Sequence, residues 1–341
     1  MGTQLKKIIR ALDIGYGACK LIRGIGRKGL AMTDSFPSIV ARIDKPCHNG
    51  LMSKKDTCCI NINEQYYEAG KDMDAAFDGG SERTLHENYI GTDEYKVLLK
   101  TSLYYMDEKN IDLLVVGLPV DYMNNKSEEL KKLIIGSHTV GDKTFNVKDI
   151  HIVPQPIGGF MSLVKSKNMP PELVRRQRNL LIDPGFFTVD YIAARGLKTI
   201  NNISGSTPYG MHALLHKVCE HISKDFNISY NNISSVDEGL QNGQFALFGK
   251  KVDLKKYVKK SLSVFNPVIK ELSNQIGDGR EITNIILVGG GAIYLQPLIK
   301  KAFPNHQILL SDTPEKANVI GFQFIGELAM NDNAQGDQHA A

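Results

Sequence analysis

The stretch Leu180-Leu181-Ile182-Asp183-Pro184-Gly185-Phe186-Phe187-Thr188-Val189-Asp190 decides how the fold is read. A short apolar run ends on an acidic residue, and a Pro-Gly pair turns the chain into a second β-rich run. Apolar runs of this length, bounded by Pro and Gly, are typical of strands joined by a tight turn. The stretch therefore predicts a hairpin with the Asp183 carboxylate at its bend.

An earlier segment, residues 8–20, repeats this design: its apolar run ends on Asp13, and the chain then turns at Gly15-Tyr16-Gly17. The chain has 341 residues, a length that fits about two domains better than a single core. The two Asp-x-Gly hairpins therefore predict an α/β fold of two duplicated domains that face each other across a cleft.

We expect the first domain at residues 1–157, with a small inserted subdomain at about 36–90, and the second domain at 158–324. A C-terminal helix at about 325–331 is expected to complete the first domain. The polar residues 332–341 are expected to form a disordered tail, as chain ends often do.

Composition restricts the class of protein. The net charge is only +4, and lysines are dispersed along the sequence, whereas nucleic-acid binders concentrate basic residues, so direct sequence-specific DNA binding is not expected. The five cysteines form no C-x-x-C pair, which predicts free thiols in a reducing compartment. No apolar run approaches the roughly 20 residues of a membrane span, and none resembles a signal peptide. We therefore expect a soluble, cytoplasmic protein with no membrane partner.

Several elements can be placed from periodicity. Residues 5–34 predict a three-stranded meander, so the G-x-G-x-x-G match at 24–29 is interpreted as a hairpin turn, since no helical pattern follows it. Thr207-Pro208 predicts a helix start, and Pro267 is expected to kink or split the helix at 258–276. The other predictions are a helix containing Tyr95 to Met106, strands at 113–119, 150–153 and 285–288, a surface loop at 169–178, and a return strand at 197–203.

The glycine-containing turns suggest a phosphate site. Gly15, Gly17, Gly185 and the triple Gly289-Gly290-Gly291 each follow an apolar strand, where backbone amides can approach phosphate oxygens unhindered by a Cβ atom. Lys20 adds a positive charge at the first turn. Two carboxylates, Asp13 and Asp183, would repel a phosphate unless a divalent cation lies near them. Mg²⁺ held largely through water meets that need.

A hydrolytic reaction at such a site also needs an oriented water molecule. Gln155 lies just beyond a predicted strand end and is the candidate for that role. An Asp-x-Gly turn, a triple glycine, a lysine and a loop glutamine are each common in proteins. The four features in this order and with these separations are much more specific.

This order resembles that of the actin/Hsp70/sugar-kinase ATPase superfamily, and most closely the ParM/StbA plasmid-segregation actins. Residues 13–20 resemble the first phosphate motif, D-x-G-x-G-x-x-K, and residues 183–190 the second. Gln155 falls where actins carry their catalytic Gln and plasmid actins a Glu. Residues 203–210 are similar to the I-S-G-D-S-x-x-G segment, and 288–292 to the adenosine motif. The resemblance implies nucleotide or phosphate contacts for Gly15, Tyr16, Gly17, Lys20, Gly185, Phe186, Phe187, Thr188, Gly205, Ser206, Gly289, Gly290, Gly291 and Ala292.

One departure from the family pattern stands out. The second motif usually reads D-x-G-G-T-T-x-D, and here Phe186 and Phe187 replace the Gly-Thr pair. Phe186 is therefore expected to constrain the turn by removing a left-handed conformation, and Phe187, which alternates with Val189, is expected to belong to the core. Gly185 and Thr188 are retained, so phosphate contact by the backbone is still expected.

The resemblance implies an ATPase that binds ATP or ADP with Mg²⁺, with GTP as the alternative nucleotide. It further implies self-assembly into filaments that segregate or position plasmid DNA through an adaptor bound to centromere-like DNA. Two alternatives stay open. One is a nonpolymerising actin-like assembly ATPase. The other is a small-molecule kinase of the same fold, for which no convincing sugar site is evident in the sequence.

Overall fold

The computed structural model describes residues 7–45, 55–73 and 89–339, and the chain divides into two compact units. Unit 1 contains the described residues up to 171 together with 311–339, and unit 2 contains residues 172–310. Parts of the segment predicted as an insertion at 36–90 lie outside the described residues, as do the last two residues of the predicted tail.

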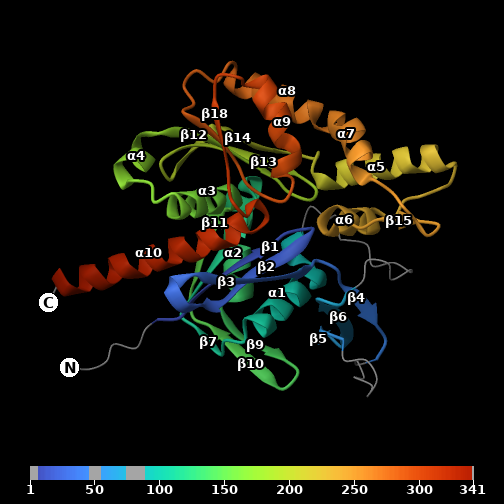
Figure 1. Ribbon diagram of the computed structural model, residues 1–341. Helices are drawn as coiled ribbons and strands as arrows, with labels where there is room; N and C mark the ends of the chain where they lie inside the picture. The colour runs from blue at the N-terminus through green and yellow to red at the C-terminus, as the bar shows by residue number, and fades with distance from the viewer. Residues whose placement is uncertain (1–6, 46–54, 74–88, 340–341) are drawn as a thin grey trace. The chain divides into compact units, whose positions relative to one another are not determined.

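Unit 1 is built on a five-stranded sheet in the order β11-β8-β1-β2-β3 (Figure 1). The central strand β1 pairs in parallel with β8 and antiparallel with β2. Its residues alternate between two cores: Leu12 packs on the side of α1 and α2, whereas Ala11 packs on the side of α10. The bounds are β1 Ile9–Ile14, β2 Ala18–Ile25, β3 Ala31–Pro37, β8 Leu113–Leu118, β11 Ile150–Pro154, α1 Asp93–Met106, α2 Met123–Ile134, α3 Gln155–Ser166 and α10 Ala317–His339.

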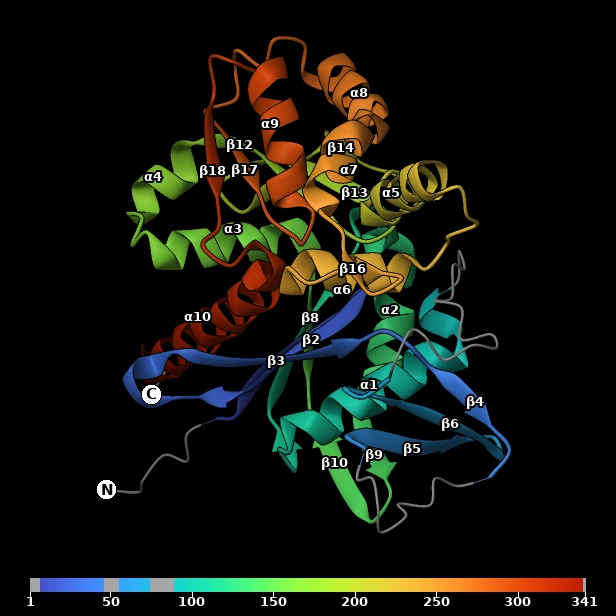
Figure 2. The same cartoon turned by 45° about the vertical axis from the view of Figure 1, so that its right-hand side comes forward.

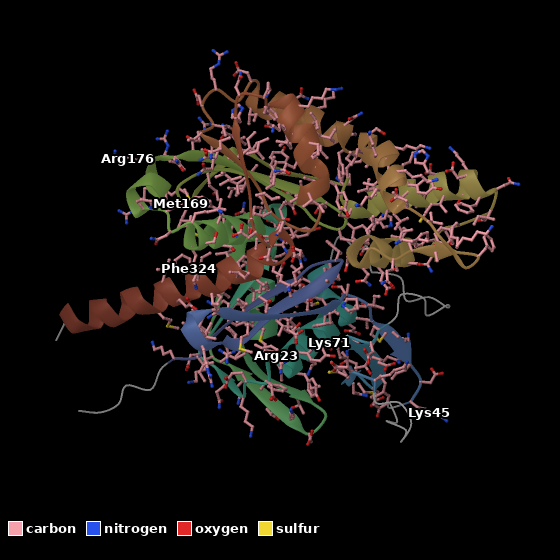
Figure 3. The ribbon with its side chains drawn as sticks, in the orientation of Figure 1. Arg23, Lys45, Lys71, Met169, Arg176 and Phe324 are labelled. Atoms are coloured by element: carbon pink, nitrogen blue, oxygen red, sulfur yellow. The ribbon has the colours of Figure 1, made fainter. Side chains whose placement is uncertain are left out.

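Two smaller sheets belong to the same unit. The sheet β4-β6-β5 lies beside α1 (Figure 2), and a second small sheet has the order β7-β10-β9. Lys71, directly after β6, places its Nζ atom 2.8 Å from an oxygen of Asp34 in β3, and Arg23 lies 3.7 Å from the same carboxylate (Figure 3). The Lys71–Asp34 ion pair connects the first small sheet to the main one, whereas the Arg23–Asp34 pair lies within the main sheet. The bounds are β4 Ala41–Ile43, β5 Thr57–Ile62, β6 Gln65–Gly70, β7 Asn110–Ile111, β9 Gly136–Val140 and β10 Lys143–Val147.

The helices α3 and α10 pack closely because two glycines lie at their crossing. A Cβ atom on Gly321 would lie within bonding distance of the Gly158 carbonyl oxygen, and one on Gly158 would overlap the ring of Phe322. This packing places α3 in unit 1, so the domain boundary predicted at residue 158 is wrong and the division falls after residue 171. Residues 311–324, predicted in the second domain, likewise belong to unit 1.

Unit 2 repeats the plan of unit 1. Its sheet has the order β14-β13-β12-β17-β18, in which the central strand β12 pairs in parallel with β17 and antiparallel with β13. The predicted duplication is therefore confirmed, with β12 in the place of β1. The bounds are β12 Arg178–Pro184, β13 Val189–Arg195, β14 Lys198–Thr207, β15 Ala246–Leu247, β16 Lys250–Lys251, β17 Asn284–Leu287, β18 Gln307–Leu310, α4 Pro171–Arg176, α5 Met211–Phe226, α6 Ile233–Asn242, α7 Leu254–Ser261, α8 Asn266–Ile276 and α9 Ala292–Ala302.

Most sequence-predicted elements are present, including the split near Pro267, which is the second residue of α8 and follows a short 3-10 helix. Three predictions differ from the structure. Thr207 ends β14, and α5 begins only at Met211. The loop predicted at 169–178 contains the short helix α4. The predicted disordered tail continues α10 as far as His339, since no proline interrupts the helix and polar composition alone does not end it. Within the described residues, no helix is both long enough and apolar enough to cross a membrane.

The contact between α3 and α10 predicts how a methyl group added at Gly321 changes the free energy of unfolding. In an open helix, Gly321→Ala would be favourable by about 1 kcal/mol. Here the methyl group meets backbone atoms of Gly158, so we expect a net loss of about 2 kcal/mol or more in the free energy of unfolding. Urea denaturation measures this. Gly24→Ala is the matched control because no atom lies within 4 Å of its Cβ position, and equal losses in the two variants would contradict the packing described.

Candidate functional site

In unit 1, the structure brings together three of the predicted site residues. Asp13 lies near the end of β1 and is 2% exposed. It faces Lys20 across the hairpin, with the Lys20 Nζ atom 3.6 Å from the Asp13 Oδ2 atom. The Gln155 Nε2 atom donates a hydrogen bond of 2.7 Å to the Asp13 Oδ1 atom. A buried carboxylate is thus stabilised by one cation and one amide donor.

The position of Gln155 follows from the fold around it. It is the first residue of α3, directly after β11, so its side chain projects from the carboxyl end of a parallel strand. Gly117 in the neighbouring strand β8 leaves the space it needs, because a Cβ atom there would lie 2.9 Å from the Gln155 Cγ atom. Its amide nitrogen donates to Asp13, and its Oε1 atom is the group that can accept a hydrogen bond from water.

The turn after Asp13 is held by a residue that the sequence analysis missed. The Ser38 hydroxyl donates to the Gly15 carbonyl, and the Ser38 N–H donates to the Gly17 carbonyl at 3.2 Å. In a planar trans peptide the following N–H points the opposite way, so Ser38 directs the amides of Tyr16 and Ala18 away from itself. Ser38 is 5% exposed. Its only sequence signal is a serine after a proline, which is common in turns.

Tyr16 is fixed by an aromatic stack. Its ring lies 4.5 Å from that of Tyr89, nearly parallel to it, and Tyr89 in turn meets the buried ring of Tyr95 edge-on. Burial is the largest cause of the raised pKa values of Tyr89 and Tyr95, so both stay neutral. The first predicted phosphate turn is therefore held by the stacking of Tyr89 on Tyr16 and by the hydrogen bonds of Ser38, which directly follows β3.

In unit 2, the second hairpin has the same plan. Asp183 lies near the end of β12, 6% exposed, and pairs in register with Asp190 of β13. The turn closes through the Gly185 N–H, which donates to the Thr188 carbonyl at 2.8 Å, and the Thr188 hydroxyl donates to Asp190 at 3.2 Å. Asp183, Gly185 and Thr188 are thus brought together as the sequence predicted.

The turn is anchored on the beginning of α5. The N–H groups of Met211, His212 and Gly210 donate to the carbonyls of Gly185, Phe186 and Phe187, at 2.9, 2.6 and 2.9 Å. Because each peptide is planar, the N–H groups of the following residues, Phe186, Phe187 and Thr188, point away from α5. Consecutive amides directed to one side form the kind of concave surface that binds phosphate.

Gly210 is essential to this contact. A Cβ atom on it would lie 2.6 Å from the Phe186 carbonyl oxygen and 2.7 Å from that of Gly185. In the sequence, Gly210 is recognisable only as part of a family pattern. The structure supplies the physical reason, which is the close approach of two backbones.

The Phe186-Phe187 pair does not strain the turn. Neither residue has a positive φ, and neither does Gly185, so none of these three residues is left-handed, and the expected constraint by Phe186 stays a prediction. The expectation that Phe187 belongs to the core is wrong. Phe186 is the ring that packs against the core of unit 2, whereas the ring of Phe187 lies 4.9 Å from that of His212 on α5.

The three glycines after β17 have different surroundings. Gly289 has φ +79°, and a Cβ atom there would overlap the Asp183 carboxylate. Gly291 lies against Pro184, 2.9 Å from the would-be Cβ position. Gly290 has no protein atom within 4 Å of that position. Two of the glycines therefore serve packing, whereas the backbone at Gly290 is open to the approach of another group.

The remaining predicted contacts lie beside these turns. Gly205 in β14 pairs with Tyr191, and its missing side chain makes room for the tyrosine ring, whose oxygen lies 2.7 Å from the Cβ position. Ser206 pairs with Asp190, and Ala292 is the buried first residue of α9. Packing is the role that the structure shows for Gly205 and Ala292, and their contact with a nucleotide stays a prediction.

Metal binding also stays a prediction. Asp13 and Asp183 lie in different units, and within the described residues no three His, Cys, Asp or Glu side chains come together as a metal site. A Mg²⁺ ion held mainly by water and phosphate oxygens needs only one or two protein carboxylates. Each buried aspartate by itself fits that requirement.

Comparison with known proteins agrees with this geometry. A family model described as the N-terminal domain of actin-like proteins matches residues 11–158, and one described as the C-terminal part of archaeal MreB-like actin homologues matches residues 181–301. Together they include the first two hairpins, Gln155 and the glycine turn. A search of curated proteins found no match.

Solved structures share the fold at low sequence identity. A ParM filament from Clostridium botulinum is 22% identical with a TM-score of 0.72, covering 95% of this chain and 100% of that one. The archaeal actin homologue Ta0583, in complex with ADP, is 17% identical with a TM-score of 0.73, covering 94% and 99%. The actin-like protein Alp7A is 14% identical with a TM-score of 0.74, covering 98% and 99%. The chain therefore has an actin-like fold, and its resemblance to the ParM-type actin homologues is confirmed.

The glycines after β17 generate a stability prediction. Gly289→Ala places a methyl group against Asp183 at a positive φ, so we expect it to lower the free energy of unfolding by about 2 kcal/mol or more. Gly290→Ala meets no atom and needs no positive φ, so its stability is expected to match that of the original chain to within about 1 kcal/mol. Thermal denaturation of both variants distinguishes the two environments, and a large loss at Gly290 would show that the space there is not open.

Proposed function

We propose that this chain, which has the fold of the actin-like proteins, binds and hydrolyses ATP and polymerises into filaments that segregate or position plasmid DNA. The observation that carries the proposal is the repeated hairpin. In each unit the central strand brings a buried aspartate to its carboxyl end, and the turn that follows has its carbonyls held from one side so that its amides point to the other. This arrangement suits the phosphates of a nucleotide.

The chemistry of each candidate site residue suggests its proposed role. Lys20 and the amides of the two turns would hold phosphate oxygens, and the open space at Gly290 would admit the nucleoside. Asp13 and Asp183 would hold Mg²⁺ through water, and that ion would neutralise charge on the phosphates. Gln155, its nitrogen tied to Asp13, would orient the attacking water through its Oε1 atom. GTP is the alternative nucleotide.

Filament formation is proposed from the solved structures that share this fold. One neighbour is described as a 15-stranded ParM filament and another as an Alp12 filament. For this chain, we propose self-association controlled by the bound nucleotide, with ATP favouring polymer and hydrolysis destabilising it. An adaptor protein bound to centromere-like plasmid DNA would link the filament to its cargo.

Sedimentation tests the assembly proposal. The chain is incubated with Mg-ATP, Mg-ADP, Mg-GTP or no nucleotide over a wide concentration range and then centrifuged. We expect a critical concentration for pelleting that is lower with the triphosphate than with ADP. If nucleotide is hydrolysed but no polymer forms at any concentration, the nonpolymerising assembly ATPase replaces the filament proposal.

Substitution of Gln155 tests the proposed chemistry. Gln155→Ala removes the group that orients water, so we expect phosphate release to slow by roughly tenfold or more while ATP binding is retained. Nucleotide binding is followed by calorimetry and release by a phosphate assay. Gln275→Ala is the control, since Gln275 is an exposed amide on α8 bonded only to Glu271 among the described contacts. Unchanged hydrolysis in Gln155→Ala would refute this role.

A further inference from the structure

Unit 2 carries a concentrated basic face on two of its helices. Helices α5 and α7 pack side by side (Figure 1). The buried residues of α7 face the core, and its four lysines occupy the opposite, exposed side. Two lysines of α5 lie nearby. We call this surface the lysine face; it consists of Lys217, Lys224, Lys255, Lys256, Lys259 and Lys260.

The charge on this face is large relative to that of the chain. Helix α7 has four lysines and no carboxylate among its eight residues, which gives a charge of +4. The whole chain also has a net charge of +4, so all other residues together sum to zero. Residues 254–261 therefore carry a local excess of positive charge already present in the sequence, and folding places it beside the lysines of α5.

Only part of this charge is neutralised within the protein. Lys217 pairs with Glu220 at 2.7 Å, and Lys256 pairs with Asp225 at 3.3 Å. Among the residues that the structure describes, Lys224, Lys255, Lys259 and Lys260 have no ion pair within 4.0 Å. Such unpaired charges on one surface raise the local concentration of anions.

His221, on α5, lies within the field of these lysines. Its pKa is lowered first by burial of the ring and then by repulsion from Lys217, Lys224 and Lys260. The imidazole is therefore neutral at pH 7 and does not add to the charge of the face. The lowered pKa of His221 agrees with the placement of lysines from α5 and α7 around the same ring.

The chemistry of the face favours phosphate over protein. Stable protein interfaces need an apolar centre and are depleted in lysine, whereas no large exposed apolar side chain is found on the described α5 or α7. The face also contains no arginine, the side chain suited to paired hydrogen bonds. Lysine ammonium groups act as point charges toward the phosphate backbone and carry no sequence information.

We propose that the lysine face binds the phosphate backbone of duplex DNA without regard to sequence. Along α7, Lys255 and Lys259 are four residues and therefore about 6 Å apart, so they can contact different phosphates. Lys224 and Lys260 extend the surface toward α5. This contact is separate from nucleotide binding, and it is compatible with the absence of sequence-specific recognition expected from the sequence.

Four substitutions, K224Q, K255Q, K259Q and K260Q, combined in one chain, test the proposal. The matched control combines K131Q, K132Q, K300Q and K301Q, which remove the same charge from exposed lysines on α2 and α9. Binding of a fluorescent duplex of mixed sequence is measured by anisotropy without added nucleotide. Between about 50 and 200 mM salt, the affinity of the unsubstituted chain should fall with a logarithmic slope near −0.9 for each phosphate contact.

We expect the lysine-face variant to bind at least about tenfold more weakly at low salt and to have a shallower slope, while the control keeps both properties. A second duplex of unrelated sequence should bind equally well. Equal weakening in the two variants, or no binding of the unsubstituted chain at low salt, overturns the proposal. Binding of vesicles with anionic lipid in place of DNA would assign the face to a membrane surface instead.

Discussion

Burying a carboxylate at the end of a central strand is the constraint on which the rest of this structure depends. An ionised carboxylate removed from water is destabilising by several kcal/mol unless neighbours bond to it. In unit 1, Lys20 and Gln155 meet that need for Asp13, and Gly117 must lack a side chain so that Gln155 can reach it. In unit 2, Gly289 adopts a positive φ beside Asp183. Residues that the family resemblance associates with nucleotide chemistry are thus also needed for packing around the carboxylates.

The two turns after the buried aspartates have the same backbone geometry but are held by different residues. Each must present backbone amides on one side, which requires its carbonyls to be held on the other. Ser38, at the end of β3, does this in the first turn, whereas the first N–H groups of α5 do it in the second. Helix α5 has no side-chain cap at its start, so the turn carbonyls also satisfy donors that would otherwise lack partners. The duplicated sheets therefore preserve a geometry while the supporting residues differ.

Local signals in the sequence predicted much of this. Apolar runs ending on Asp13 and Asp183, followed by glycine, predicted both hairpins, and their order predicted the fold. The sequence could not predict the support of the turns, because Ser38 and Gly210 act through backbone atoms more than 20 positions away. It assigned α3 to the wrong domain for the same reason, since the partner of Gly158 lies in α10. Four residues of the lysine face are close together in the sequence at 254–261, but its extension onto α5 could not be predicted because it depends on two helices, separated by about 30 residues, packing side by side.

The crossing of α3 and α10 also fixes the order in which the chain can fold. One face of the sheet in unit 1, including Ala11 and Val115, is covered by Val319 and Phe322 of α10. During synthesis these residues emerge after all of unit 2, whose described part is the continuous segment 172–310. Unit 2 can therefore fold while unit 1 still exposes an apolar face, and chains tend to fold domain by domain as they emerge. Completion of unit 1 requires contacts between residues more than 300 positions apart, which makes it the slower step of folding.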